Sequence, residues 1–193
     1  NAGAFAKLQI LVPGEAAVPG SATGKSGTVT TQTAGTAFNV TVKAVDANWN
    51  LVNTATDTVG ISSSDANATL PANAALVSGT QTFSVTPKTS GSRTVTATDS
   101  SDGTKTASTS SAIPVSAGAF VKLQLLVPGE TADPGTATGK TGTPNNATAG
   151  SAFTVTVNAV DAYWNLVNSI TDTAGITSSD ANATLPANAA LVA

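Results

Sequence analysis

Apolar and polar residues alternate along several short stretches of the chain, which is the pattern of a β-strand with one buried face. The stretch Phe5–Val12 alternates, with Lys7 and Gln9 on one face and four apolar residues on the other, Ala6, Leu8, Ile10 and Val12. The stretch Ala37–Val45 alternates more regularly, and one side holds Phe38, Val40, Val42 and Ala44. We therefore predict a strand in each stretch, and we expect Lys7 to point into solvent.

Weaker alternation and turn residues predict the remaining strands. Clusters of Gly, Asp, Asn and Pro separate the apolar stretches, and no stretch sustains a helical period. Further strands are predicted at Leu51–Val59, Thr80–Val85, Ser92–Asp99 and Thr104–Val115. Short, Thr-rich strands between such turns are typical of a β-sandwich, so we expect an all-β fold.

An internal repeat organises the chain. Residues 2–15 return almost unchanged as residues 117–130, and the correspondence runs without a gap to the last residue. A unit of this length is the size of one β-sandwich domain. We expect a first domain at 1–116 and a second at 117–193, with the second lacking a counterpart of residues 79–116. Either the sequence is a window on a longer array, or another molecule supplies the final strands by strand addition.

The composition argues against several classes of function. The chain has 193 residues with no Cys, His or Met, so catalysis by His or Cys and the usual zinc, haem and iron–sulfur sites lack their ligands. Its net charge of −3, with 8 basic residues, argues against nucleic-acid binding. No apolar run approaches the length of a membrane span. We therefore expect no enzyme, no nucleic-acid partner and no membrane span in this segment.

Two segments resemble a known family. Residues 38–52 form a strand that ends in Asp and continues through an Asn-containing turn to Val, and residues 90–99 form a late strand entered through Gly. These features resemble the bacterial immunoglobulin-like repeats of invasin- and intimin-type adhesins. The chain departs from that pattern at Trp49, where the family commonly has Gly, and in the long segment 56–79. The resemblance implies tandem immunoglobulin-like β-sandwich domains in an extracellular protein of a bacterial cell surface.

The turn after the most regular strand holds a candidate metal site. Asp46, Asn48 and Asn50 alternate there, and alternating oxygen-bearing side chains are able to surround a calcium ion. The second copy replaces Asn48 by Tyr163, so one of these ligands is lost. The alternative is a plain turn, because Asp and Asn bond their own backbone. We expect the turn and no cofactor, with calcium as the alternative.

The same turn holds the candidate interaction residues. Trp49 and Trp164 are the two tryptophans and occupy the same position in the two copies, and Tyr163 precedes the second. A Trp in a loop either packs on its own domain or contacts a partner or a sugar. We expect packing within the chain, with a contact to another molecule as the alternative.

Near-identical tandem copies favour a structural role. Successive repeats add length or multivalency directly, whereas an enzyme gains little from them. Charged side chains normally block pairing between strand edges, and they are 10% of this chain. We expect units that associate with adjacent repeats and with each other into a stalk, fibre or sheath. The alternative is an adhesive or carbohydrate-binding module that uses the Trp49 and Trp164 turns.

Overall fold

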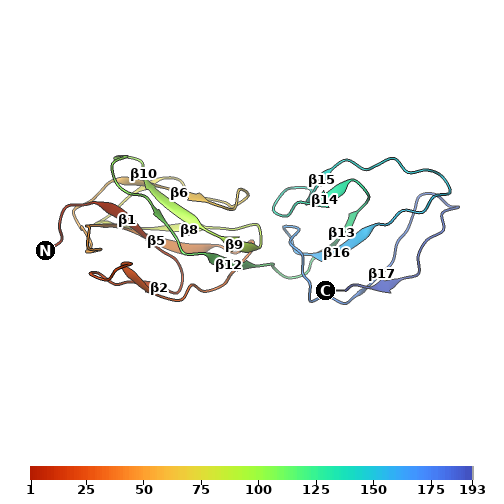
Figure 1. The fold of residues 1–193 in the computed structure, drawn as a ribbon, viewed down its shortest axis with the longest axis horizontal. Coiled ribbons are helices and arrows are strands. Elements are labelled where there is room, and N and C mark those ends of the chain that lie inside the picture. Colours follow the sequence, from red (N-terminus) through yellow and green to blue (C-terminus); the bar gives the residue numbers. More distant parts are fainter. Residues whose placement is uncertain (193) are drawn as a thin grey trace. The chain divides into compact units, whose positions relative to one another are not determined.

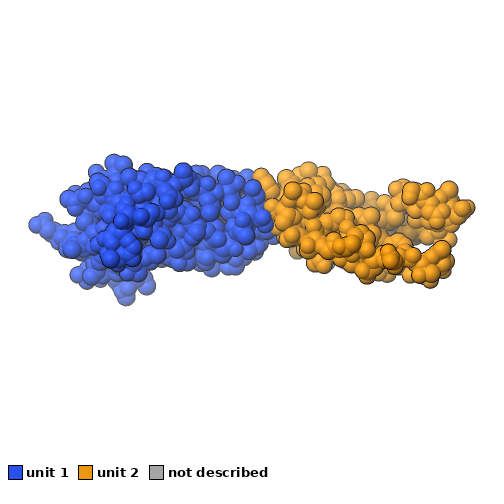
Figure 2. Space-filling view, turned by 90° about the horizontal axis from the view of Figure 1, so that it is seen from above, with its two compact units in different colours: residues 1–116 blue, residues 117–193 orange. Residues whose placement is uncertain are grey.

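The regular structure of residues 1–192 consists of β-strands. The computed structural model describes residues 1–192, and the chain divides into two compact units, residues 1–116 and 117–193 (Figure 2). No helix occurs among residues 1–192, so none of them forms a helix that could cross a membrane. The predicted all-β class is confirmed.

Unit 1 contains strands β1 to β12 (Figure 1). Most are short, because Gly, Pro and Asx turns interrupt the apolar stretches. Their bounds are β1 (Lys7–Leu11), β2 (Glu15–Ala17), β3 (Lys25–Gly27), β4 (Gln32–Thr33), β5 (Phe38–Val45), β6 (Thr58–Ser63), β7 (Ala74–Ala75), β8 (Thr80–Val85), β9 (Gly91–Arg93), β10 (Val95–Asp99), β11 (Ser108–Thr109) and β12 (Ile113–Ser116).

Three sheets enclose the core of unit 1. Their strand orders are β1-β5-β8, β11-β10-β6-β7 and β4-β12-β9, and β2 and β3 form a separate hairpin. Alternate residues of β5, from Phe38 to Ala44, point into this core, as the sequence pattern predicts. Apolar residues of β1, β6, β8, β10 and β12 meet them there. The unit is therefore a β-sandwich with a core built of Val, Ile, Leu, Phe and Ala.

Strand β1 is covered on both faces, so one sequence prediction is wrong. Gln9, expected on the open face, is 1% exposed. Its Nε2 donates to the carbonyl oxygen of Gly24 at 2.7 Å, because the segment that contains the β2–β3 hairpin covers this face. Lys7 is only half-exposed, and it lies on an aromatic ring rather than in solvent. Alternation alone does not reveal a second covering layer whose residues are small or polar.

Other strand predictions hold to different extents. The predicted strand 80–85 has the bounds of β8, and the predicted strand 92–99 is divided at Thr94 into β9 and β10. The predicted strand 51–59 is wrong for most of its length, because Leu51 makes only an isolated bridge to Val45 and β6 begins at Thr58. The predicted strand 104–115 consists of the separate strands β11 and β12.

Unit 2 repeats part of this architecture. Its strands are β13 (Lys122–Leu126), β14 (Glu130–Ala132), β15 (Lys140–Gly142), β16 (Thr156–Val160), β17 (Thr173–Ala174) and β18 (Ala189–Ala190). β13 pairs with β16 as β1 pairs with β5, and β14 pairs with β15 as β2 pairs with β3. β17 and β18 likewise keep the register of the start of β6 and β7.

Candidate functional site

The candidate residues of unit 1 all lie in the turn that follows β5. The backbone closes the turn when Trp49 N donates to the Asp46 carbonyl oxygen at 3.2 Å and Asp46 N donates to that of Asn50 at 3.0 Å. Trp49 adopts a φ of +67°, in the left-handed region that a bulky side chain seldom enters. The turn therefore holds a residue in a conformation that Gly would adopt without strain, at the position where the resembled family commonly has Gly.

The Asp46 carboxylate holds this turn together. Its Oδ1 accepts from the backbone N–H groups of Asn48 and Asn50 at 2.8 and 2.9 Å. Its Oδ2 accepts from the N–H of Gly3 at 2.8 Å and from Asn50 Nδ2 at 2.9 Å. These donors, led by the Gly3 N–H and the Asn50 amide, hold the pKa of Asp46 far below its usual value. The carboxylate therefore acts as a structural acceptor that ties the start of the chain to the turn.

The calcium candidates do not form a converging set of oxygens in this arrangement. Asn50 directs its amide N–H to Asp46, and Asn48 contributes its backbone N–H. Among the described residues there is also no group of three or more Asp, Glu, His or Cys side chains placed to hold a metal. A calcium ion here would need Asn50 to turn its amide oxygen toward Asp46. The expectation of a turn without a cofactor, with calcium as the alternative, stays a prediction for experiment.

Trp49 lies between two parts of its own unit. The Lys7 ammonium is 3.4 Å from the centre of the indole ring and donates to the Ala47 carbonyl oxygen at 3.0 Å. Gly24 lies against the ring so closely that a Cβ at this position would collide with it. The Gly20 N–H also donates to the carbonyl oxygen of Asn48 at 2.7 Å. We call this group, Lys7, Gly24 and Trp49, the tryptophan clasp, and it fastens the β2–β3 segment to the turn.

Unit 2 contains the same clasp. The Lys122 ammonium is 3.4 Å from the centre of the Trp164 ring, and a Cβ at Gly139 would collide with that ring. Trp164 has a φ of +70°. Tyr163, the third interaction candidate, is half-buried, and its carbonyl oxygen accepts from the Gly135 N–H at 2.8 Å, as that of Asn48 does from Gly20. The Asn-to-Tyr difference therefore leaves the backbone of the turn unchanged.

A buried carboxylate completes the anchoring of the β2–β3 hairpin. Glu15 pairs with Lys25 at 2.8 Å, accepts from Ser111 Oγ at 2.7 Å and accepts from the Val12 N–H at 3.1 Å. Burial raises the pKa of Glu15, but these hydrogen bonds and the Lys25 charge outweigh it and hold the pKa below its usual value. The sequence prediction missed Gly24, Glu15 and Lys25. Their recurrence in the second copy was the available signal.

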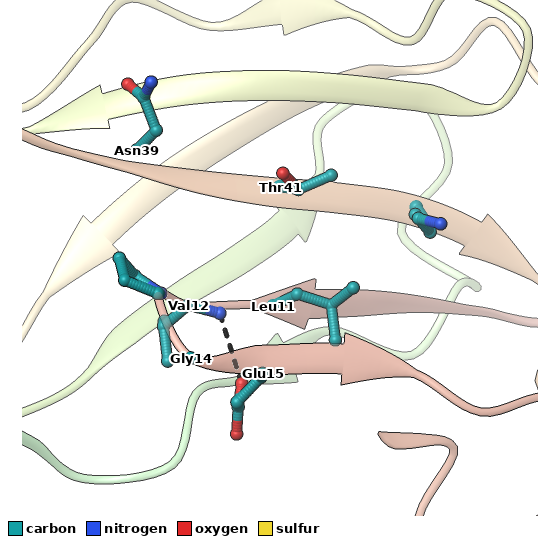
Figure 3. Close-up of a pocket in the computed structure, with 8 residues that line it drawn as sticks. Leu11, Val12, Gly14, Glu15, Asn39 and Thr41 are labelled. Atoms are coloured by element: carbon teal, nitrogen blue, oxygen red, sulfur yellow. Dashed lines mark hydrogen bonds between the residues drawn. The ribbon is translucent and has the colours of Figure 1, made fainter. Parts of the chain in front are cut away.

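A shallow depression of about 350 Å³ lies beside this hairpin (Figure 3). The turn Leu11–Glu15 forms one side of it, and Asn39, Thr41 and Lys43 of β5 form the other. Its single carboxylate, Glu15, is already engaged by Lys25 and Ser111. The depression thus lacks the pair of free carboxylates that glycoside hydrolysis requires.

The carboxylate of Asp65, in the long middle segment, also has a structural role. It is 2% exposed and accepts from the backbone N–H groups of Asn67, Lys88 and Thr89 and from the Thr89 hydroxyl. Burial raises its pKa, but these hydrogen bonds, with Thr89 foremost, bring the net shift below the usual value. Asp65 therefore joins the segment after β6 to the segment after β8.

Comparisons with known proteins give only distant similarity. No protein-family model matches the chain, and no curated protein sequence matches it. Three solved structures of the surface layer protein SbsC are similar to it. Domains 1–6 have 18% identity and a TM-score of 0.36, covering 79% of this chain and 19% of that one. Domains 5–6 have 19% identity and a TM-score of 0.33, covering 79% and 76%. Domains 4–9 have 19% identity and a TM-score of 0.36, covering 89% and 26%.

These similarities leave the family of the chain open. The chain spans 19% of the length of the first of these structures. The resemblance to invasin- and intimin-type repeats is not confirmed by a family model. The functional argument therefore depends on the residues and contacts of the chain itself.

Proposed function

We propose that this chain is a structural repeat of an extracellular bacterial surface protein, in which successive β-sandwich units build a stalk, fibre or sheath. The observation that carries the proposal is that, in both units, the charged and aromatic residues of the turn contact other residues of the same unit. Trp49 and Trp164 each engage a Lys and a Gly of their own unit. Asp46 and Asp161 each close their own turn.

Repetition supports a mechanical role. About three quarters of the aligned positions are identical between the copies, and the clasp is among the features that recur. A duplicated unit that stabilises itself with its own turn adds length without needing a new ligand site. Self-association through strand edges fits the low content of charged residues, which normally protect such edges.

Localisation and assembly test this proposal directly. Antibodies raised against the purified chain should label the outer surface of intact source cells in immunogold electron microscopy, and external protease should remove the label. Negative-stain images of the extracted protein should show continuous fibres or layers. Labelling confined to the cytoplasm would contradict the proposal, as would a dispersed protein that turns over a substrate.

An adhesive or carbohydrate-binding module is the second candidate. The observation in its favour is that both indole rings remain partly exposed despite the clasp. Replacing Trp49 and Trp164 together by Phe should then abolish binding to a glycan array while circular dichroism shows the β-structure retained. Unchanged binding, or no binding by the parent chain, would exclude the two tryptophan turns as the contact.

A further inference from the structure

One edge of β8 points away from its sheet neighbour β5. Thr80 exchanges backbone hydrogen bonds with Val77, at 2.9 and 3.0 Å. Thr86, just beyond the other end of β8, exchanges them with Thr69, at 2.8 and 3.0 Å. Neither Val77 nor Thr69 belongs to β5, so the backbone groups of Thr80 and Thr86 face away from that strand. Because this direction alternates along a strand, Thr82 directs its backbone N–H and C=O to the same free edge.

The turn between Val77 and Thr80 starts a hairpin that does not continue. In a regular antiparallel hairpin, the next hydrogen-bonded pair would lie two residues further along each strand, at Ala75 and Thr82. Instead Ala75 belongs to β7, which pairs with β6 in another sheet. The Ala75 carbonyl and the Thr82 N–H, which a regular hairpin would join, therefore do not meet where the two strands part.

The half-buried side chain of Gln81 joins these two groups. Its Oε1 accepts from the Thr82 N–H at 3.0 Å, and its Nε2 donates to the Ala75 carbonyl oxygen at 3.2 Å. Only one orientation of the amide satisfies both contacts, since the N–H needs an oxygen and the carbonyl needs an N–H. One side chain thus takes up an edge donor of the β1-β5-β8 sheet and an edge acceptor of the β11-β10-β6-β7 sheet.

Charged side chains do not protect this part of the unit. Residues 66–87 contain no Asp, Glu, Lys or Arg, although charged side chains are the usual protection of a strand edge. Val77, which pairs with the start of β8, is 70% exposed. An uncharged strand with free backbone groups, next to an exposed apolar side chain, is able to pair with the same strand of another molecule.

We propose that Gln81 guards this side of unit 1 and keeps β8 from pairing with β8 of a second copy of the chain. The amide occupies the Thr82 N–H that an incoming strand would need, and it ties the edge to β7, so the strand has to displace Gln81 before it pairs. A second copy is the partner that fits, because the outward side chains of β8 are Thr and Ser, which form favourable pairs across antiparallel strands. The inference concerns unit 1 alone and does not depend on the proposed structural role.

Hydrogen exchange of single amides tests the contact. In the isotope-labelled 193-residue protein, exchange at Thr82 and Ser84 is followed by NMR and corrected for the intrinsic rate of each amide. By the alternation of the strand both N–H groups face the free edge, but within residues 1–192 only that of Thr82 has a side-chain acceptor. We expect Thr82 to exchange about five- to tenfold more slowly than Ser84, which is the effect of one hydrogen bond. Gln81→Ala should remove this difference.

Sedimentation velocity tests whether the opened edge pairs with a second copy. Gln81→Ala should sediment as a larger species than the wild-type chain at the same concentration, and its Thr82 exchange should slow as the concentration rises. Gln81→Glu keeps an acceptor for Thr82 and adds a charge to the edge, so it should sediment as the wild type does. Gln32→Ala is the matched control, because Gln32 lies in β4 and its amide contacts only Thr30, and it should change neither readout.

The two readouts together decide whether Gln81 is a guard. Loss of Thr82 protection together with association of Gln81→Ala supports the inference. Equal exchange of Thr82 and Ser84 in the wild-type chain overturns it, as does a Gln81→Ala variant that loses the protection but sediments as the wild type, or equal association of Gln32→Ala. If circular dichroism shows that Gln81→Ala has lost its β-structure, Gln81→Met takes its place, because it keeps the length of the side chain without the amide. Failure would leave the structural role standing, since localisation on the cell tests that role.

Discussion

Replacing Trp49 by Gly should destabilise unit 1 less than replacing it by Ala. At most positions Gly costs stability relative to Ala, because it has more conformational freedom to lose on folding. Trp49 has a φ of +67°, which Gly adopts freely and which costs any residue with a Cβ about 1–2 kcal/mol. If the Gly variant has a higher free energy of unfolding than the Ala variant, the backbone at this position is strained.

The magnitude follows from the contacts of the ring. Truncating a fully buried Trp to Ala costs about 3–5 kcal/mol, so a half-buried ring implies about 2 kcal/mol. The Lys7 contact at 3.4 Å adds about 0.5–1 kcal/mol. We expect Trp49→Ala to cost about 2–3 kcal/mol of unfolding free energy. Trp49→Gly should cost about 1 kcal/mol less, since relief of strain exceeds the added entropy of the unfolded chain.

Native-state hydrogen exchange across residues 38–45 measures these changes, because tryptophan fluorescence of unit 1 is lost in both variants. A difference of about 1 kcal/mol changes the exchange rate about fivefold, with the Ala variant exchanging faster. Trp164→Gly and Trp164→Ala, read across residues 153–160, form the matched pair, because Trp164 has a φ of +70°. A Trp49→Ala variant as stable as Trp49→Gly, or more stable, would refute the strained-backbone argument.

Three further predictions concern polar groups of unit 1. Gln9 Oε1 is buried without a partner, whereas its counterpart Gln124 Oε1 accepts from Asn158 Nδ2 at 2.9 Å. Lys43 stands at the position of Asn158 in the first copy, so Lys43→Asn should supply the missing donor and stabilise unit 1 by about 1 kcal/mol. Urea unfolding measures this, and an unchanged midpoint would contradict it. The pKa of Asp46 is lowered on folding, so the stability that Asp46 contributes is present above its unfolded pKa of 3.8 and is lost as the pH falls below that value. The free energy of unfolding should therefore be lower at pH 2.5 than at pH 6, and Asp46→Asn should reduce this difference. Calcium should leave the melting temperature unchanged relative to EGTA, because N–H donors surround Asp46, and a rise of several degrees would show that Asn50 reorients to bind the ion.

The sequence predicted strands in which apolar and polar residues alternate and missed the layer without such alternation. β5 was located almost to the residue from its regular alternation, and β8 from weaker alternation between turn residues. The β2–β3 hairpin consists of Glu, Ala, Lys, Ser and Gly, and its position depends on contacts with Trp49 and Gln9 that lie far away in sequence. Strand propensity describes local sequence and does not include such long-range contacts.

The candidate residues share one turn, but the arrangement of their side chains could not be predicted from the sequence. Asp46, Asn48, Asn50 and Trp49 do lie together, as their spacing requires. Spacing along the sequence does not fix side-chain orientations. It therefore could not show that Asn50 turns its amide nitrogen toward Asp46 or that Lys7 lies on the indole ring. One signal was present, since Trp stands where the resembled family commonly has Gly.

From the sequence we expect the tryptophan turn to pack within the chain, with a contact to another molecule as the alternative. In the structure the ring of Trp49 contacts Lys7 and Gly24 of its own unit. The same clasp is present in unit 2, where Lys122 and Gly139 contact Trp164. All of its residues belong to the segment that is repeated between the two copies. Each unit therefore fastens its own hairpin segment to its own turn, which is what a repeat that stabilises itself requires.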